Sequence, residues 1–412
     1  QELMGGDGMQ IQIDRRNPNL LYTGYQFGNY FRINRETNES KKITPKLPKE
    51  SKEDPYRFNW QTPILLSSHN QDILYLGSHY LHRSFNQGDT WSVISPDLTQ
   101  GGKEGNVPYG TISTLSESPF QFGLLYTGSD DGLVYLTKDG GNNWTNITPK
   151  DLDESLINAI DVSSVNKGTA YIAVNKYKVT DFTPISYKTN DYGKTWVSIN
   201  QGIGKDDYLR VIREDLKVPG LLYGGAERAF YISADAGANW SLFQLNMPVV
   251  GITDLTFRDN DLVASTAGRA FWILDDLEVI RNYNVSDSTK IILYPIEDTY
   301  QVNGGSKLNE PGNDASGTDL KEGVPTLVTL NVMKSTRAED RELKKLLSAP
   351  ITEQATVNQV LKELRNHPAL EQSREQLLAI AKEARTLLGP LPVNDATGAL
   401  FSLCDAVIDR SA

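Results

Sequence analysis

One eight-residue pattern recurs four times between residues 84 and 240, and it constrains the fold more than any other feature of the chain. The pattern is Ser/Thr-x-Asp/Asn-x-Gly-x-x-Trp, and its tryptophans are Trp91, Trp144, Trp196 and Trp240. They follow one another at steps of 53, 52 and 44 residues. A recurring period of this length indicates a chain built from repeated structural units, each long enough for four short strands.

A second phrase, in most copies Leu-Tyr-x-Gly, precedes each pattern and also occurs where the pattern is degenerate. Its copies begin at Leu21, Leu74, Leu125, Ala170, Leu222 and Leu262. They define six units, of which the first and last carry degenerate patterns at residues 34–40 and 275–276.

Each unit has the composition of antiparallel hairpins, because short runs of β-branched and aromatic residues alternate with Gly, Asn and Asp. In the third unit we expect strands at residues 111–115, 124–127, 133–136 and 144–147. Radial repetition of four-stranded sheets predicts an all-β propeller.

The eight-residue pattern itself has a structural interpretation. Its Asp or Asn can accept hydrogen bonds from backbone amides across a turn, its Gly can take a positive φ, and its Trp can fill the space between adjacent sheets. We therefore interpret eight residues as structural: Asn86, Trp91, Asp139, Trp144, Asp191, Trp196, Asp235 and Trp240.

Composition and charge exclude several classes of partner. Lys and Arg number 41 against 52 Asp and Glu, a net charge of −11, which argues against a nucleic-acid groove or an anionic membrane patch. No apolar run is long enough to span a membrane. The single cysteine, Cys404, excludes an internal disulfide, and its apolar neighbours Leu403 and Val407 predict a buried thiol.

Motifs for bound cofactors and for common catalytic chemistry do not occur. The four histidines are too scattered for a metal site, and the sequence has no phosphate-binding loop, zinc-binding helix or nucleophile elbow. We therefore assign no cofactor, no metal and no catalytic residue.

The eight-residue pattern is that of the Asp-box, or bacterial neuraminidase (BNR) repeat. Together with residues 58–70, 94–99, 109–119 and 271–277, it makes residues 5–300 resemble the bacterial "glycosyl hydrolase, BNR repeat" proteins, which have sortilin-type propellers. The chain is similar to the C-terminal half of such proteins, so its six units are expected to belong to a larger ring or to a two-propeller clamp.

This resemblance implies an exported protein, periplasmic or extracellular, that acts as a binding or scaffold module for protein or glycan ligands. It also implies a partner in an outer-membrane or cell-surface assembly. The alternative is a sialidase-like or xyloglucanase-like glycoside hydrolase. The hydrolase name of these proteins is largely inherited from the repeat, so it is weak evidence of catalysis. The cysteine-rich module of animal sortilins is absent, which favours a bacterial-type member.

Ligands are expected on the face away from the eight-residue patterns, because antiparallel strands place alternate connections at opposite ends. The candidate ligand-binding residues on that face are Arg228, Arg269, Trp60, Tyr109, Asp7 and Asp130. Each also has a structural interpretation. Trp60 and Tyr109 could fill gaps between sheets, and Asp7 and Asp130 could stabilise turns.

Arg228 and Arg269 occupy equivalent positions in neighbouring units, so two guanidinium groups could clamp one carboxylate. The alternative is that they pair with Glu227, Asp275 or Asp276. By the same resemblance a sialidase would need a third arginine, a Tyr nucleophile assisted by Glu and an acid/base Asp, which we cannot place. A retaining or inverting glycosidase would need two carboxylates about 5–10 Å apart.

The chain after the repeats has a different composition. We predict propeller sheets over residues 1–300, a linker with a β segment over 301–333, in which 324–332 form a strand, and a helical domain over 334–412. Helices are expected at residues 340–347, 352–366, 369–388 and 394–409.

Overall fold

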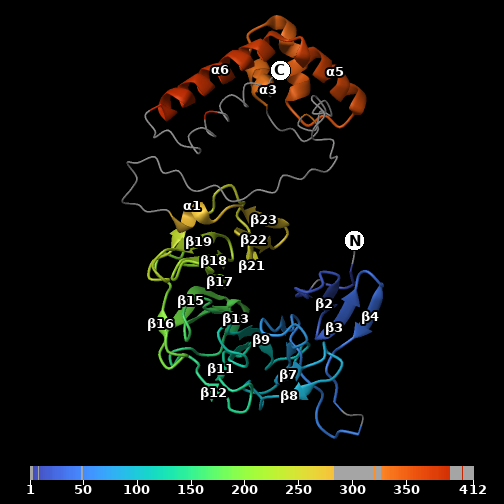
Figure 1. Cartoon of the computed structure of the whole chain (residues 1–412), viewed down its shortest axis with the longest axis vertical. Coiled ribbons are helices and arrows are strands. Elements are labelled where there is room, and N and C mark those ends of the chain that lie inside the picture. The colour runs from blue at the N-terminus through green and yellow to red at the C-terminus, as the bar shows by residue number, and fades with distance from the viewer. Residues whose placement is uncertain are drawn as a thin grey trace. The chain divides into compact units, whose positions relative to one another are not determined.

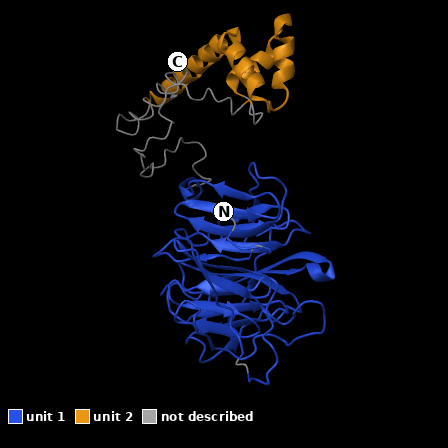
Figure 2. Cartoon of the chain, turned by 90° about the vertical axis from the view of Figure 1, so that its right-hand side faces the viewer, with its two compact units in different colours: residues 1–296 blue, residues 297–412 orange. Residues whose placement is uncertain are grey.

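The structure is a computed structural model that describes residues 3–7, 9–47, 50–282, 320, 326–389 and 401. The chain divides into two compact units, Gln1–Ile296 and Glu297–Ala412, which Figure 2 colours separately. The first unit holds the strands and the second holds helices, so each is described by itself.

Six antiparallel sheets make up the first unit, and the predicted β-propeller fold is confirmed (Figure 1). Sheets 1 to 3 comprise β1 (Gln12–Ile13), β2 (Leu20–Tyr25), β3 (Asn29–Asn34) and β4 (Glu39–Lys42); β5 (Ile64–Leu66), β6 (Leu74–Gly77), β7 (Leu81–Ser84) and β8 (Ser92–Val93); β9 (Ile112–Glu117), β10 (Leu125–Ser129), β11 (Val134–Thr137) and β12 (Thr145–Asn146).

Sheets 4 to 6 comprise β13 (Leu156–Val162), β14 (Ala170–Lys176), β15 (Asp181–Thr189) and β16 (Val197–Ser198); β17 (Leu209–Glu214), β18 (Leu222–Ala226), β19 (Phe230–Ser233) and β20 (Ser241–Leu242); β21 (Ile252–Arg258), β22 (Asp261–Thr266) and β23 (Phe271–Leu274). Among the described residues, sheet 6 therefore has three strands where the other five sheets have four. Its third strand leads to a short helix, α1 (Glu278–Arg281), with which the described part of this unit ends at residue 282.

The Leu-Tyr-x-Gly phrase forms the second strand of a sheet, and its side chains build the core between sheets. Five tyrosines at the same position are at most 1% exposed: Tyr22, Tyr75, Tyr126, Tyr171 and Tyr223. Each belongs to a buried apolar cluster that joins its sheet to a neighbouring one. The sheets are thus held face to face by burial of apolar surface.

The four eight-residue patterns form the turns between the third and fourth strands, and we call them the box turns. In each turn the Asp or Asn side chain accepts a hydrogen bond from the backbone N–H four residues later, at 2.8–2.9 Å. The glycine of each turn has a φ between 78° and 98°, where a side chain would be strained.

Every box turn also fastens its sheet to the preceding one. The indole Nε1 of Trp91, Trp144, Trp196 and Trp240 donates to the carbonyl of Ile43, Ile94, Ile147 and Ile199 in turn, at 2.6–2.8 Å. The glycine of the same turn lies on that isoleucine, closely enough that an added Cβ would clash. These four contacts define four fastened junctions, from sheets 1–2 to sheets 4–5.

The two ends of the propeller carry different connections between strands. The box turns lie at one end, which we call the box face. The turns between second and third strands and the segments that enter each first strand lie at the other end, which we call the loop face, because consecutive antiparallel strands reverse direction.

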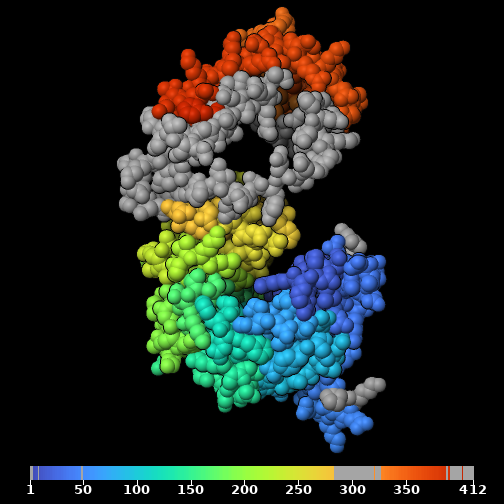
Figure 3. Space-filling model, in the orientation of Figure 1, coloured from blue at the N-terminus to red at the C-terminus, as the bar shows by residue number. Residues whose placement is uncertain are grey.

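Sheets 1 and 6 leave an open side. None of the buried apolar clusters in the described part of the chain joins these two sheets, and Figure 3 shows a notch between their blue and yellow surfaces. On β23, Trp272 and Leu274 pack towards sheet 5. Phe271 and Ile273, which alternate with them along the strand, are 74% and 59% exposed. Sheet 6 thus leaves two large apolar side chains uncovered.

The second unit contains four described α-helices: α3 (Leu327–Lys334), α4 (Arg341–Leu347), α5 (Gln354–Arg365) and α6 (Pro368–Leu388). The helices predicted at residues 340–347, 352–366 and 369–388 are confirmed as α4, α5 and α6. Most of the predicted helix at residues 394–409, including Cys404, lies outside the described residues. Among the described helices, none is both long and apolar enough to cross a membrane.

The strand predicted at residues 324–332 is wrong, because the described part of that segment forms α3. Thr326 caps this helix: its side chain accepts a hydrogen bond from the Thr329 backbone N–H, and the Thr329 hydroxyl in turn accepts one from the Thr326 backbone N–H. Val332 is fully buried in the apolar cluster of the helical unit. The cap and this packing outweigh the β propensity of a Val- and Thr-rich sequence.

Candidate functional site

The loop face is built by turns that rest on the segment entering the first strand of the same sheet. In sheet 3 the N–H of Asp130 donates to the carbonyl of Thr111 at 3.0 Å, and in sheet 5 the N–H of Glu227 donates to Tyr208 at 3.2 Å. In sheet 6 the N–H of Ala267 donates to Gly251 at 2.8 Å. This repeated contact holds turn residues at the rim of each sheet.

Arg228 and Arg269 lie on such turns, in sheets 5 and 6. Both are exposed, and neither forms an ion pair with an acid in the described part of the chain. The Arg228 side chain donates from Nη2 to the carbonyl of Asp206 at 3.0 Å. Glu227, which could have neutralised it, instead pairs with Arg210. Within the described residues, both guanidinium groups are therefore left without an ion pair on this part of the loop face.

The two arginine-bearing turns lie on either side of Gly251. The Gly251 carbonyl accepts the hydrogen bond from Ala267, and a Cβ added to Gly251 would lie 3.2 Å from the Glu227 carbonyl oxygen. The same Cβ would lie 3.7 Å from the Ala267 Cβ. The fold thus brings Arg228 and Arg269 onto adjoining turns of one rim.

An aromatic hairpin borders these turns. Strands β14 and β15 are the longest pair in the propeller, and the hairpin they form projects from the sheets in Figure 2, with the short helix η1 (Tyr177–Val179) at its tip. Tyr177 and Phe182 are 45% and 42% exposed, and Phe182 stacks on Tyr208 with ring centroids 6.4 Å apart. The Tyr208 hydroxyl donates to Glu227 at 3.0 Å, which links the hairpin to the Arg228 turn.

Tyr109 and Trp60 lie further round the loop face. Tyr109 donates its hydroxyl to the Glu154 carboxylate, and the Lys103 Nζ lies 4.5 Å from the centre of its ring. Burial, with the adjacent Glu154 carboxylate, raises the pKa of the Tyr109 hydroxyl. Trp60 is 47% exposed and meets the Phe27 ring edge-on, with centroids 5.1 Å apart. Both residues keep a partly open aromatic surface.

The acidic candidates on the loop face are occupied by hydrogen bonds. Asp130 is 3% exposed, and its two oxygens accept from the backbone N–H and the hydroxyl of Thr111 at 2.8 and 3.0 Å. Its neighbour Asp131 accepts from the Gln100 N–H at 2.7 Å and from the Ser129 hydroxyl. Burial raises the pKa of both carboxyls. Asp7 is exposed and accepts from Gln26 Nε2 at 2.6 Å.

One loop-face contact had no signal in the sequence. Arg57 donates from Nη2 to Asp97 at 2.7 Å and from Nε to the Gly110 carbonyl at 3.1 Å, so it ties sheet 2 to the entrance of sheet 3. Burial, reinforced by the Arg57 charge, lowers the pKa of the nearby His79 to about 4. Within the described residues, no group of three or more His, Cys, Asp or Glu side chains could hold a metal ion.

Comparison of the sequence with known proteins does not show a family. No family model matches the chain. A curated protein, nonaprenyl diphosphate synthase of Mycobacterium tuberculosis (strain ATCC 25618 / H37Rv), is 26% identical over 205 residues, which are 50% of this chain and 48% of that protein. The chain therefore spans about half the length of the curated protein it matches. This identity and coverage do not assign a family.

Solved propellers give the structural likeness. The GH74 xyloglucanase from Xanthomonas campestris aligns with a TM-score of 0.50 and 17% identity, over 65% of this chain and 45% of that one. YCF48 bound to D1 peptide aligns with a TM-score of 0.46 and 16% identity, over 65% and 79%. At 17% identity the likeness to the xyloglucanase shows the β-propeller fold alone.

Proposed function

We propose that the propeller is a recognition or scaffold module whose loop face binds a protein or glycan ligand through a carboxylate group of that ligand. The observation that carries this proposal is the pair Arg228 and Arg269, which are exposed and lie on adjoining turns beside Gly251. The Arg228 backbone N–H donates to the Asp207 carboxylate at 2.8 Å, but neither guanidinium group forms an ion pair among the described residues. Guanidinium groups left without a carboxylate are suited to bind one from a ligand, with two parallel hydrogen bonds each.

The aromatic side chains of the same rim support this proposal. Tyr177 and Phe182 are partly exposed at the β14–β15 hairpin, close to the Arg228 turn through Tyr208. Exposed aromatic rings beside arginines are typical of the central residues of binding surfaces, because they bury much area at little entropic cost. A ligand bound by both arginines would extend over this hairpin.

We further propose the finer identity that the repeat implies. The box turns make the chain similar to Asp-box, sortilin-type propellers, and on that resemblance the protein is exported to the periplasm or the cell exterior. There it serves an outer-membrane or cell-surface assembly, and its six sheets are part of a larger ring or of a two-propeller clamp. The open side between sheets 1 and 6 is compatible with a larger ring.

The experiment is a binding screen on arrays of peptides and glycans, repeated with a double variant. R228A/R269A is expected to weaken the strongest carboxylate-containing hit by more than tenfold, because each lost charged hydrogen bond is worth about 1.5–3 kcal/mol. The matched control R15A/R35A removes the same charge from exposed turns of the box face. Equal binding by both double variants would contradict the proposal.

A second candidate function, glycoside hydrolysis, is favoured by one observation. Asp130 and Asp131 are adjacent carboxyls whose pKa is raised by burial, as in the general acid of a glycosidase. Their four oxygens are already engaged, which favours the structural role. Incubation with xyloglucan oligosaccharides tests this candidate: sugar release by the wild type and its loss in D130N would support it, and no release would remove it.

A further inference from the structure

Two junctions of the box face share one arrangement of arginine and turn. Arg32 on β3 and Arg83 on β7 occupy the same register position, opposite the buried Tyr22 and Tyr75 of the adjacent strand. Each guanidinium reaches to the next sheet. There its Nη1 donates a hydrogen bond to the backbone carbonyl of the fourth residue in the box turn of that next sheet. That residue is Gln87 for Arg32, at 3.1 Å, and Gly140 for Arg83, at 2.9 Å.

The junctions differ in the sixth residue of the turn. At the first junction this residue is Asp89, whose Oδ1 lies 3.1 Å from Arg32 Nη1 and 2.7 Å from Lys41 Nζ, so one carboxylate within the chain is shared by the two cations. At the second junction the residue is Asn142, which has no charge. Arg83 forms no ion pair within the described part of the chain, and its buried Nε has no hydrogen-bond partner.

The other groups around Arg83 do not supply the missing carboxylate. The Phe85 ring lies against the guanidinium, with its centroid 4.6 Å from Cζ. On β6, Tyr75 lies beside Arg83, and its hydroxyl donates to Glu117 Oε1 at 3.2 Å. Glu117 Oε2 accepts from the Ser67 hydroxyl at 2.7 Å. The Glu117 carboxylate is therefore already held by other donors.

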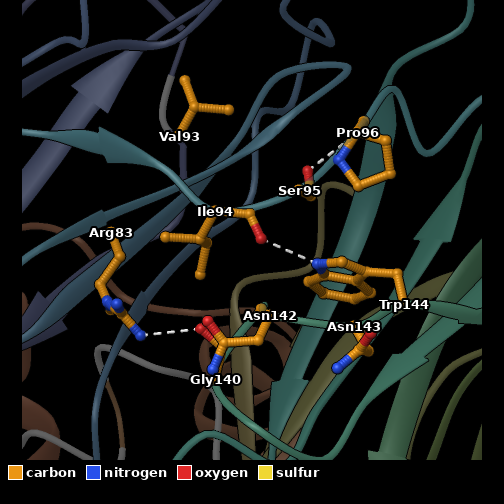
Figure 4. A pocket seen from close by; sticks show the side chains of 10 residues that line it. Arg83, Val93, Ile94, Ser95, Pro96, Gly140, Asn142, Asn143 and Trp144 are labelled. Atoms are coloured by element: carbon orange, nitrogen blue, oxygen red, sulfur yellow. Dashed lines mark hydrogen bonds between the residues drawn. The ribbon is translucent and has the colours of Figure 1, made fainter.

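A pocket of about 480 Å³ opens beside Arg83 (Figure 4). In the figure the guanidinium of Arg83 reaches towards Gly140 and Asn142, while the Trp144 ring and Pro96 form the opposite part of the wall. A volume of this size is in the range of small-molecule sites, and most of the surface that faces this pocket is polar, which suits a ligand rich in hydroxyl groups. The pocket thus offers a cation, side-chain amides and an aromatic surface.

We propose that this pocket binds a carboxylated sugar of the uronate type. The sugar carboxylate takes the place beside Arg83 that the Asp89 carboxylate takes beside Arg32, and the sugar ring lies against Trp144. The chain itself supplies the precedent for a carboxylate at this position, and the aromatic wall together with the volume favours a ring over a simple anion. This site lies on the box face and is separate from Arg228 and Arg269.

The third junction provides the comparison within the same molecule. Its pocket has about 570 Å³, but Leu136 takes the position of the arginine, and lysines line the wall with Asp151. If glucuronate bound only because lysine side chains attract acids, it would bind in this third-junction pocket as well. Variants of Arg83 and Asn142 therefore separate the proposed site from non-specific charge effects.

The test titrates D-glucuronate into the protein by ligand-detected NMR, with D-glucose and acetate as matched probes. Glucose has the ring without the charge, and acetate has the charge without the ring. We expect glucuronate to bind at least tenfold more tightly than either. R83Q is expected to lose this preference, and so is N142D, because its new carboxylate neutralises Arg83 as Asp89 neutralises Arg32.

The control variant is K194Q, which removes a lysine from the pocket of the third junction and is expected to leave glucuronate binding at Arg83 intact. Thermal unfolding of each variant checks that the propeller is folded, and N142D keeps Arg83 if R83Q does not fold. Binding that is equal for acetate and glucuronate would overturn the sugar assignment. Binding that is unchanged in folded N142D, or absent from the wild type, would overturn the site.

Discussion

Trp240 offers the sharpest test of how the sheets are fastened. It is 4% exposed, and its Nε1 donates to the carbonyl of Ile199 at 2.7 Å, across the junction of sheets 4 and 5. The substitution Trp240→Phe keeps an aromatic ring in this place but removes the donor. The Ile199 carbonyl then loses its shorter hydrogen bond and keeps a longer one from the Ser186 hydroxyl, at 3.3 Å.

The expected loss follows from two contributions. A buried polar group left without its hydrogen bond costs about 1–3 kcal/mol. The smaller ring leaves space that costs roughly 1 kcal/mol more. We therefore expect Trp240→Phe to lower the free energy of unfolding by about 2–4 kcal/mol.

The assay is urea unfolding followed by far-ultraviolet circular dichroism, because fluorescence would change with the substitution itself. The matched control is Trp60→Phe on the loop face, where the indole is 47% exposed. We expect this control to change the free energy of unfolding by no more than about 0.5 kcal/mol. A loss at Trp240 as small as that at Trp60 would refute the fastening role of the box-turn indole.

Two further predictions concern buried or hydrogen-bonded charges. The backbone N–H of Thr195 holds the pKa of Asp191 at about 2, below its usual 3.8, so its stabilising contribution is present above pH 3.8 and is lost as pH falls towards 2. The variant D191N should accordingly show a smaller fall in melting temperature than the wild type between pH 4 and pH 2, and an equal fall would contradict this. Arg281 and Asp215 are 3% and 0% exposed and form an ion pair at 2.9 Å, so R281A should cost about 3–5 kcal/mol by leaving a buried carboxylate unpaired. Chemical unfolding measures this cost, and a loss below 1 kcal/mol would show that the carboxylate finds another partner.

The fold was predictable where local chemistry repeats. The box turns are set by residues within eight positions of one another, so Gly141 and Trp144 identify their turn without knowledge of the rest of the chain. Sheet 6 was less predictable, because residues 275–276 showed a degenerate pattern but not that the helix α1 follows its third strand directly. The strand predicted at residues 324–332 failed because its β-branched residues are held in a helix by tertiary packing.

The candidate site was predictable only in part. Alignment of the repeats placed Arg228 and Arg269 at equivalent turns, but the sequence could not show that Glu227 pairs with Arg210 instead. The contrast between Asp89 and Asn142 is visible in the sequence, yet its meaning depends on which arginine of the preceding sheet faces each residue. Contacts across a junction join residues about one repeat apart, and the register that aligns them is a property of the folded sheets.

The most direct test of the loop-face proposal is hydrogen–deuterium exchange measured by mass spectrometry, with the strongest peptide or glycan hit from the array added in excess. We predict slower exchange at residues 226–229 and 266–270, the two turns that carry Arg228 and Arg269, and at the β14–β15 hairpin. Slower exchange confined to the box turns, with residues 226–229 and 266–270 unchanged, would contradict the account.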